Sequence, residues 1–148
     1  MSQNQEDAYR RLLAERSGGR GVLVTLKRDG RPQLSNVGYS YDAATDTVRI
    51  ATTDDRAKTR NARRDPRVSF HVTTEDMFAF GVFEGTASVS EVAADPHDAV
   101  VDELCDMYRA TQGEHEDWEE FRRTKVKDQR LVLRVRVERA YGFIFQKS

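Results

Sequence analysis

The strongest constraint on the fold is a two-residue alternation near the end of the chain. From 131 to 138 every odd-numbered position is Leu or Val, and the even-numbered positions 134, 136 and 138 carry charges. Successive side chains of a β-strand point to opposite faces, so this run predicts a strand with one buried and one exposed face. Such a strand needs neighbouring strands and a second apolar layer, because a lone strand has nothing to cover its apolar face.

Turn signals separate several further segments of strand character. The segments are 21–26, 33–41, 47–52, 67–72 and 77–90. Asp29-Gly30 lies between the first two and predicts a β-hairpin, and a short turn at 42–46 joins the next pair. Because strands with short connections pair antiparallel, we predict a small antiparallel barrel of about six strands, with segment 77–90 bent at a glycine.

Helical periodicity accounts for the rest of the chain. We predict an N-terminal helix within 1–17, a short helix at 55–64, a helical insertion over 95–127 and a closing strand at 130–145. Asp95 followed by Pro96 is typical of a helix start, and Asp117 is a candidate cap for a second helix in the insertion. No linker interrupts the pattern, so we predict one domain over 1–148.

The predicted barrel limits where a ligand can bind. A barrel of this size is filled by its own side chains, so a sizeable ligand must bind outside it, in a groove made with helices or a second subunit. Phe78, Phe80 and Phe83 lie on one predicted strand that would need a cover. We therefore predict a homodimer.

Composition excludes several classes of protein. The formal net charge is -1, charged residues make up 33% and the mean hydropathy is -0.73, which is typical of a folded domain in water. No apolar run reaches the ~20 residues of a membrane helix, and the polar N-terminus lacks signal-peptide blocks, so we expect a cytoplasmic protein without membrane contact. The single cysteine, Cys105, is expected to be a buried thiol, and His97 and His115 lack metal-ligand spacing.

Five cations lie within nine positions of the short predicted helix. They are Arg56, Lys58, Arg60, Arg63 and Arg64. Helical spacing places Lys58 with Asn61 on a different face from Arg56, so the five cannot all meet one phosphate. Three interpretations stay open: a solvated helix face, a nucleic-acid patch, or a pocket for a phosphorylated ligand. Arg56 and Lys58 matter most, because they flank the free N–H groups of the first turn.

Polar residues gather on strands near this helix. Thr52 and Thr53 end the strand before it, and Gln33, Ser35 and Asn36 lie on the hairpin strand. If these strands are neighbours, amide and hydroxyl groups would line a surface beside two cations. Such a surface suits a planar, polar-edged ring system with a phosphate tail. The alternative for each hairpin residue is a solvated strand edge.

Four segments resemble the pyridoxamine-phosphate-oxidase-like flavin and deazaflavin split-barrel family. They are Gly-Arg-Pro-Gln-Leu-Ser-Asn-Val at 30–37, Arg-Ala-Lys-Thr-Arg-Asn at 56–61 with Arg-Asp-Pro at 64–66, Glu-Gly-Thr at 84–86 and Val-Glu-Arg-Ala-Tyr-Gly at 137–142. More narrowly, they resemble actinobacterial deazaflavin-dependent reductases that use coenzyme F420. The resemblance implies a mainly β fold with peripheral helices: a six- to seven-stranded antiparallel split β-barrel, homodimeric, with the cofactor in a groove at the subunit interface.

The resemblance also assigns candidate cofactor-binding residues. Arg56 and Lys58 match the Arg-x-Lys pair that binds the cofactor phosphate, and Thr59 and Asn61 would support the tail and loop. The other matched positions would lie near the ring, ribityl chain or tail, or would come from the partner chain: Gln33, Ser35, Asn36, Thr52, Thr53, Arg64, Phe78 and Phe80. The C-terminus lacks the arginine- and histidine-containing segment of authentic pyridoxamine phosphate oxidases, so we do not expect vitamin B6 phosphate oxidation.

The function implied by the resemblance is hydride transfer from reduced coenzyme F420 to a small organic acceptor, with FMN as the alternative cofactor. Arg60, Arg63 and Arg64 favour the deazaflavin, whose phosphodiester and oligoglutamate tail carry extra negative charge. A non-catalytic flavin or deazaflavin carrier is a second alternative. Nucleic-acid binding is disfavoured, because the aromatic residues fall at apolar strand positions instead of along a basic groove.

No residue stands out as catalytic. Tyr39, Tyr41 and His71 are candidate proton donors by residue type alone, and His71 is expected to face outward from its strand, opposite Val68 and Phe70. The acceptor leaves no recognisable spacing pattern, so quinones, enones, tetrapyrroles and nitroaromatics are all compatible with the sequence.

Overall fold

Seven β-strands, all paired antiparallel, form one sheet in the computed structural model, which describes residues 2–145. The strands are β1 (Arg20–Leu26), β2 (Pro32–Gly38), β3 (Ser40–Asp42), β4 (Thr47–Thr53), β5 (Arg67–Thr73), β6 (Phe80–Val89) and β7 (Arg130–Phe143). Their order across the sheet is β2-β1-β5-β6-β7-β4-β3. The long strand β7 pairs with both β6 and β4. The predicted mainly β, antiparallel split-barrel fold is confirmed.

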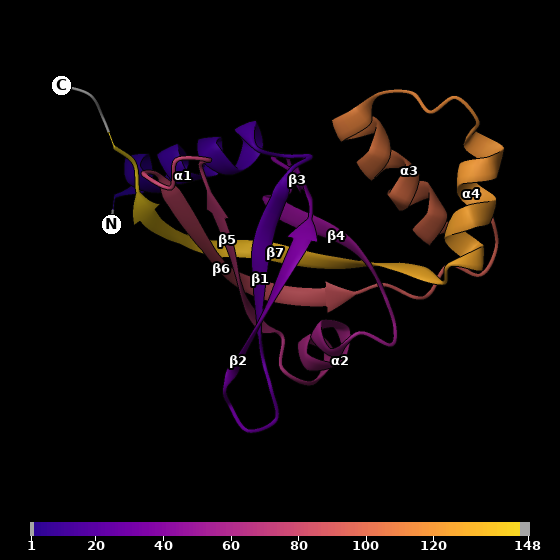
Figure 1. Cartoon of the computed structure of the whole chain (residues 1–148), viewed down its shortest axis with the longest axis horizontal. Coiled ribbons are helices and arrows are strands. Elements are labelled where there is room, and N and C mark those ends of the chain that lie inside the picture. Colours follow the sequence, from indigo (N-terminus) through magenta and orange to yellow (C-terminus); the bar gives the residue numbers. More distant parts are fainter. Residues whose placement is uncertain (1, 146–148) are drawn as a thin grey trace.

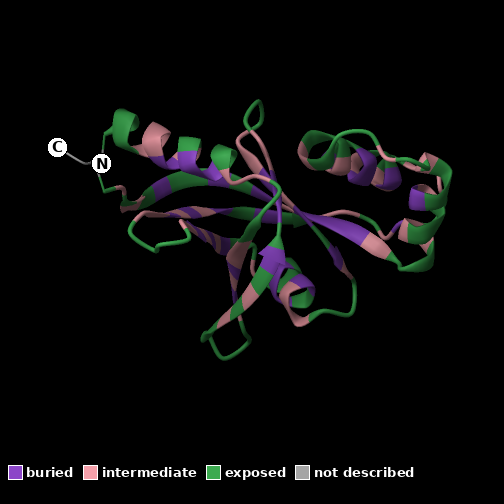
Figure 2. Ribbon diagram, turned by 45° about the horizontal axis from the view of Figure 1, so that its top comes forward, coloured by how far each residue is buried: buried purple, intermediate pink, exposed green. Residues whose placement is uncertain are grey.

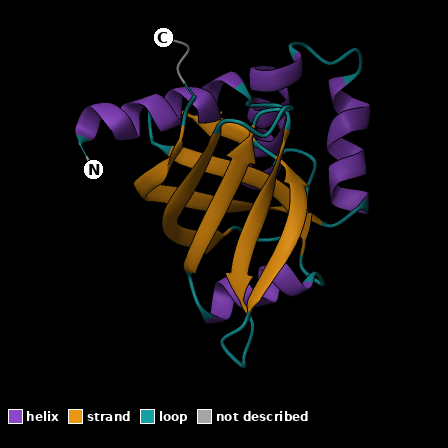
Figure 3. Cartoon of the chain, turned by 60° about the vertical axis from the view of Figure 1, so that its left-hand side comes forward, coloured by secondary structure: helices purple, strands orange, loops and turns teal. Residues whose placement is uncertain are grey.

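Four helices surround this sheet in the described part of the chain. They are α1 (Gln3–Glu15), α2 (Ala57–Arg64), α3 (Ala99–Gln112) and α4 (Trp118–Lys127). Helices α1 and α2 lie at opposite ends of the curled sheet, and α3 and α4 stand together on one side, beyond β3 and β4 (Figures 1 and 3). None of the helices in residues 2–145 is long and apolar enough to cross a membrane.

The sheet curls until one edge strand, β2, approaches β4, the strand next to the other edge. Strands β2 and β4 are not hydrogen-bonded neighbours, yet they approach each other across the split. Strand β6 bends at Gly85, where its pairing with β7 shifts register after Glu84. A Cβ atom at Gly85 would collide with the backbone of Arg136, so glycine permits the close approach. The bend at a glycine agrees with the prediction.

The inner faces of the strands form the main core. Its fully buried members are Leu23, Val48, Ile50, Phe70, Val72, Phe83, Leu133 and Val135. In β7 the odd-numbered positions from 131 to 137 are all buried, as their alternation predicts. Burial of one such side chain contributes about 1.5–3 kcal/mol. Because side chains fill the interior, a sizeable ligand has to bind outside the barrel.

Helix α1 closes one end of this core. Its buried side, which includes Tyr9 and Leu13, faces the sheet, while the opposite side is exposed (Figure 2). The Tyr39 hydroxyl donates to the Leu13 carbonyl at 2.7 Å, and the Tyr9 hydroxyl donates to the Gly142 carbonyl at 2.9 Å. These two bonds tie α1 to the junction between β2 and β3 and to β7.

Helices α3 and α4 form a second, smaller core with the outer face of β7. Its buried members are Ala93, Val101, Leu104, Cys105, Met107, Phe121 and Val132. Val132 departs from the alternation of β7 because the strand is covered on both faces at this point. The Cys105 thiol is free and buried, as predicted.

The start of α3 differs from the prediction of a helix that begins at Asp95-Pro96. The helix begins at Ala99, and its N-cap is Asp98, which accepts a hydrogen bond from the Val101 amide at 2.9 Å. The Asp98 carboxylate also accepts bonds from two amides of the preceding turn. One carboxylate thus serves both the turn and the helix, whereas the Asp95 carboxylate bonds one backbone amide.

Element boundaries differ from the prediction at three strands. The predicted strand 33–41 divides at Tyr39 into β2 and β3, because the Tyr39 backbone bonds to the loop after α1 instead. The predicted strand 77–90 begins only at Phe80, since 74–79 form a turn in which Met77 has a φ of 65°. Phe78 therefore lies in a turn. The closing strand ends at Phe143, and residues 146–148 lie outside the described part of the chain.

Candidate functional site

Helix α2 follows β4 closely and starts without a side-chain cap. Arg56 is the N-cap residue and makes no capping bond. In the segment before the helix, the Thr53 hydroxyl donates to Asp55 at 2.6 Å. That hydrogen bond lowers the pKa of the Asp55 carboxyl, and the positive charge of Arg56 lowers it to a lesser extent. The buried Thr59 hydroxyl donates to the Thr53 carbonyl at 2.8 Å, which fixes the helix to the strand. Because the N-cap side chain makes no capping bond, the N–H groups of the first turn favour an anion.

The cations of α2 have different surroundings. Arg63 pairs with Asp54 at 2.5 Å, and Arg64 donates to a β1 carbonyl at 2.6 Å. Arg56 and Lys58 have no carboxylate within ion-pair distance in residues 2–145. As the helical spacing predicts, the five cations do not share one partner. Arg60 likewise has no carboxylate within ion-pair distance in the described part of the chain, so Arg56, Lys58 and Arg60 are left for a ligand.

A third cation lies beside this pair. Arg130 begins β7 directly opposite Thr53 of β4. The pKa of the Lys58 ammonium is lowered, mainly because the group is partly buried and also because Arg56 and Arg130 repel its charge. The buried Nε of Arg130 has no hydrogen-bond partner within residues 2–145. We refer to Arg56, Lys58 and Arg130 as the cation corner. Neighbouring like charges and an unpaired buried donor indicate a place suited to an anion.

Arg130 is absent from the residues predicted from sequence. It lies outside the motif around Arg56, and only the register between β4 and β7 brings it beside the start of α2. Basic residues outnumber acidic ones after position 121, which is a weak indication of an anion site in this part of the chain. That excess does not identify which arginine takes part.

The buried face of α2 anchors the helix to the barrel through Asn61. Its Nδ2 donates to Gln33 Oε1 at 2.6 Å and to Thr25 Oγ1 at 3.1 Å. The Arg64 guanidinium donates to Asn61 Oδ1 at 3.0 Å. Asn61 is 7% exposed and Thr25 is fully buried. The structure therefore brings the predicted residues Gln33, Asn61 and Arg64 together in one hydrogen-bonded network.

An open groove of about 450 Å³ lies between α2 and the β1–β2 turn. Its lining includes Gln33, Asn61 and Ala57, one acid, Asp29, and four cations, Lys27, Arg28, Arg60 and Arg64. We refer to it as the cationic groove. Because Ala57 lies between Arg56 and Lys58 in the chain, the groove begins next to the cation corner. Its excess of positive charge suits an extended polyanion.

The other predicted ring contacts do not share one surface. Thr52 faces the core and is 3% exposed, whereas Thr53 faces outward. On β2, Gln33 and Ser35 share one face and Asn36 lies on the other. Strands β2 and β4 are not paired, so the condition for the predicted continuous polar surface is not met in the sheet. The polar groups lie instead on both sides of the split.

Phe78 and Phe80 lie at the end of the sheet opposite α2. Arg67 begins β5 directly after α2, whereas Phe80 pairs with Thr73 at the far end of β5. Phe78 is 70% exposed, and Phe80 packs on the His71 ring with 5.7 Å between ring centroids. Within one chain these phenylalanines lie away from the cation corner. His71 faces outward from its strand, as predicted.

The two candidate tyrosines already use their hydroxyl protons. The Tyr39 hydroxyl donates to a buried carbonyl, and burial raises its pKa far above the ordinary value. The Tyr41 hydroxyl donates to Asp46 Oδ1 at 2.6 Å, and burial and this bond raise its pKa as well. Neither hydroxyl is placed to give its proton to a ligand.

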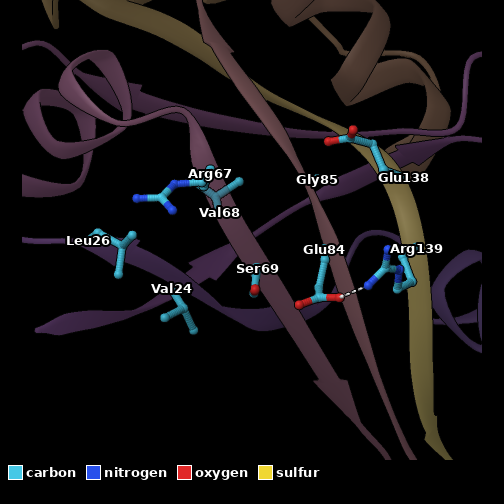
Figure 4. A pocket seen from close by; sticks show the side chains of 9 residues that line it. All are labelled: Val24, Leu26, Arg67, Val68, Ser69, Glu84, Gly85, Glu138 and Arg139. Carbon is cyan, nitrogen blue, oxygen red and sulfur yellow. Dashed lines mark ion pairs between the residues drawn. The ribbon is translucent and has the colours of Figure 1, made fainter. Parts of the chain in front are cut away.

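A separate hollow of about 380 Å³ lies on the outer face of β1, β5, β6 and β7 (Figure 4). Apolar side chains such as Val24 and Leu26 line one side of it. On the other side Glu84 and Arg139 pair at 4.0 Å and neutralise each other. None of the predicted site residues lines this hollow, so it is a weaker candidate for the cofactor than the cation corner.

Comparison with known families defines the class of protein. Residues 6–143 match the family model described as pyridoxamine 5'-phosphate oxidase. The match spans nearly the whole chain, so the chain belongs to the pyridoxamine 5'-phosphate oxidase-like split-barrel family.

Several solved structures share this fold. An F420 reductase is 23% identical, with a TM-score of 0.62 and coverage of 88% of this chain and 94% of that one. A putative pyridoxamine 5'-phosphate oxidase from Listeria innocua is 19% identical, with a TM-score of 0.65 and coverage of 93% and 96%. The heme storage protein HutZ from Vibrio cholerae is 16% identical, with a TM-score of 0.65 and coverage of 93% of each chain. These likenesses show the fold, which proteins of different function share.

Proposed function

We propose that this chain is an oxidoreductase that binds coenzyme F420 and transfers a hydride from the reduced deazaflavin to a small organic acceptor. The observation that carries the proposal is the cation corner, where Arg56, Lys58 and Arg130 meet at an uncapped helix start. Family membership supports a cofactor of this kind, because members of the family bind flavins or F420.

The residues of the cation corner fit a phosphate group. Guanidinium and backbone N–H groups bind phosphate oxygens through charge-assisted hydrogen bonds, and an ammonium adds a compact charge. In this proposal Arg56, Lys58 and Arg130 hold the phosphate, and the unpaired Arg130 Nε gains a partner. Thr59 and Asn61 act indirectly, because they fix α2 in place.

The cationic groove favours F420 over FMN. Its four cations offer charge partners to the carboxylates of an oligoglutamate tail, which FMN lacks. Arg64, predicted as a tail contact, lines the groove, whereas Arg63 pairs with Asp54 and does not. An FMN-dependent oxidoreductase of the same fold, or a carrier without turnover, is the alternative.

The bound deazaflavin supplies the hydride, and the chain supplies position. Because the phosphate joins the ring side of the cofactor to the tail, holding both groups would fix one end of the cofactor and limit where the ring can lie, which lowers the entropic cost of reaching the acceptor. Tyr39 and Tyr41 keep their protons in internal hydrogen bonds, so a proton for the acceptor has to come from elsewhere.

We further propose that the protein is a homodimer with the cofactor groove at the subunit interface. Leu34, Met77 and Phe78 are 64%, 74% and 70% exposed, and large apolar side chains left in water favour a partner surface. The turn that carries Phe78 lies away from the cation corner of its own chain. A second copy is therefore proposed to bring this turn to the ring.

A titration of the purified protein with oxidised F420 and, side by side, with FMN tests the cofactor proposal. We expect F420 to bind at least about tenfold more tightly, with an affinity that falls as salt screens the cationic groove. Equal or tighter binding of FMN would assign the protein to the flavin branch. Binding of neither would refute the assignment of the cation corner to a cofactor phosphate.

A further inference from the structure

A second groove, separate from α2, lies between the barrel and the helix pair α3–α4. It has a volume of about 360 Å³, within the range of small-molecule sites. One wall comes from the junction of β2 with β3 and from β4, and the other from α3 and α4, the two helices beside those strands in Figure 1. The apolar part of the lining includes Leu104, Met107, Tyr108 and Phe121. We refer to it as the α3–α4 groove.

One wall of this groove holds an unsatisfied polar group. Ser40 lines the groove and is 3% exposed, and its Oγ has no hydrogen-bond partner in residues 2–145. A buried hydroxyl without a partner costs free energy, and native structures rarely leave one. A ligand with a hydrogen-bonding group at this place would remove that cost.

The opposite wall holds an unpaired cation. Lys125 lines the groove, and its Nζ lies 4.6 Å from the centre of the Phe121 ring. The pKa of this ammonium is lowered, mainly by burial and to a lesser extent by repulsion from Arg130. No carboxylate lies within ion-pair distance of Lys125 among residues 2–145. An anionic ligand group beside Lys125 would offset its burial.

The acidic residues of α3 do not neutralise Lys125, because they pair elsewhere. Glu103 pairs with Arg134, and Asp102 pairs with Arg122 at 2.9 Å. The groove therefore combines aromatic and aliphatic walls with the buried, unpaired Ser40 hydroxyl and a cation without an ion-pair partner in the part of the chain that the structure describes.

We propose that the α3–α4 groove binds an aromatic carboxylate. The ring system packs against Leu104, Met107 and Tyr108, the carboxylate meets Lys125, and a polar group of the ligand bonds Ser40. The site uses no residue of the cation corner or the cationic groove, so it stands whether or not the chain binds F420.

The chain carries a built-in reporter for this groove. Trp118 is its single tryptophan, and it packs edge-on against Tyr108 and Phe121, with ring centroids 5.7 and 5.4 Å apart. Both partners line the groove. The indole N–H donates to Glu114 at 2.9 Å, and because the chain has one tryptophan we expect one indole N–H signal in the NMR spectrum.

The experiment is an NMR titration of the cofactor-free protein with 2-naphthoate and with 2-naphthamide, a neutral molecule of nearly the same shape. We expect naphthoate to move the Trp118 indole signal saturably and to bind about tenfold more tightly than naphthamide. No movement, or equal affinities for the two molecules, would overturn the proposal. This comparison needs no variant.

Variants then locate the contacts. Lys125→Gln should remove the preference for naphthoate over naphthamide. Ser40→Ala should lower the affinity for both molecules about threefold. The matched control Lys127→Gln, at an exposed position of the same helix, should change neither affinity. Lys58→Ala should leave naphthoate binding intact, which separates this groove from the cation corner. If folded Lys125→Gln still binds naphthoate more tightly than naphthamide by the same factor, the proposed contact between the carboxylate and Lys125 is wrong.

Discussion

Lys58 and Arg63 show how two cations on one short helix can differ in what they contribute. Arg63 already has a carboxylate partner in Asp54, whereas Lys58 is partly buried among other cations and its pKa is lowered. An anion that approaches Lys58 restores an interaction that burial and repulsion have weakened. An anion near Arg63 competes with an existing ion pair. The free energy of phosphate binding is therefore expected to depend on Lys58 far more than on Arg63.

Replacing Lys58 tests this difference. Lys58→Ala should weaken F420 binding by about 1.5–3 kcal/mol, the usual contribution of a hydrogen bond to a charged group. Arg63→Ala is the matched control on the same helix and should change affinity little. Fluorescence titration measures both. Equal losses in the two variants would mean that the helix contributes only its overall charge.

Arg130 offers a second test at the residue scale. Its buried Nε lacks a partner, and its charge repels Lys58, so it is expected to contribute little to the stability of the free protein. Arg130→Met should leave the unfolding midpoint of the free protein unchanged or slightly raised, while it weakens F420 binding at least about tenfold. Thermal unfolding and titration separate the two effects. A large loss of stability with normal affinity would show that Arg130 is a structural residue.

At the level of elements, one buried amide ties α2 to the hairpin strands β1 and β2. Asn61 connects the helix to Gln33 and Thr25, and it receives a bond from Arg64. Asn61→Ala leaves those groups without their partner, so we expect a loss of about 1–3 kcal/mol in the free energy of unfolding. Urea denaturation measures the loss. Arg60→Ala, on the exposed side of the helix, is the control. Unchanged stability in Asn61→Ala would mean that water replaces the lost bonds without cost.

The sequence predicted the elements better than it predicted their ends. The alternation of β7 and the position of α2 followed from local spacing, which is a property of the chain itself. The start of α3 did not, because Asp95 and Asp98 are both good caps and the surrounding turn decides between them. Phe78 fell in a turn because Met77 adopts a positive φ, which its residue type does not predict.

At the scale of the whole molecule, the split in the barrel decides where the candidate site lies. Strands β2 and β4 approach without pairing, and α2 follows β4 and packs against β1 and β6. Arg130 could not be predicted, since only the β4–β7 register places it opposite Thr53. The division of Gln33 and Asn36 between two faces of β2 follows from strand geometry, but which face meets a ligand depends on the whole sheet.

The proposed homodimer can be tested at one exposed side chain. Phe78 is an exposed apolar residue in a turn remote from its own cation corner. Phe78→Asp should dissociate the proposed dimer and lower the affinity for F420, because the ring then loses its cover. Sedimentation velocity and titration measure the two effects. Thr45→Asp, in the exposed turn after β3, is the control. A dimer that persists with normal affinity in Phe78→Asp would contradict the proposed interface.

The most direct test of the account is a crystal structure of the protein with bound F420. We expect the cofactor phosphate to lie among Arg56, Lys58 and Arg130, within hydrogen-bond distance of the Arg130 Nε. We expect the oligoglutamate tail to follow the cationic groove past Arg60 and Arg64. A phosphate bound elsewhere, with the cation corner still unpaired, would contradict the central claim.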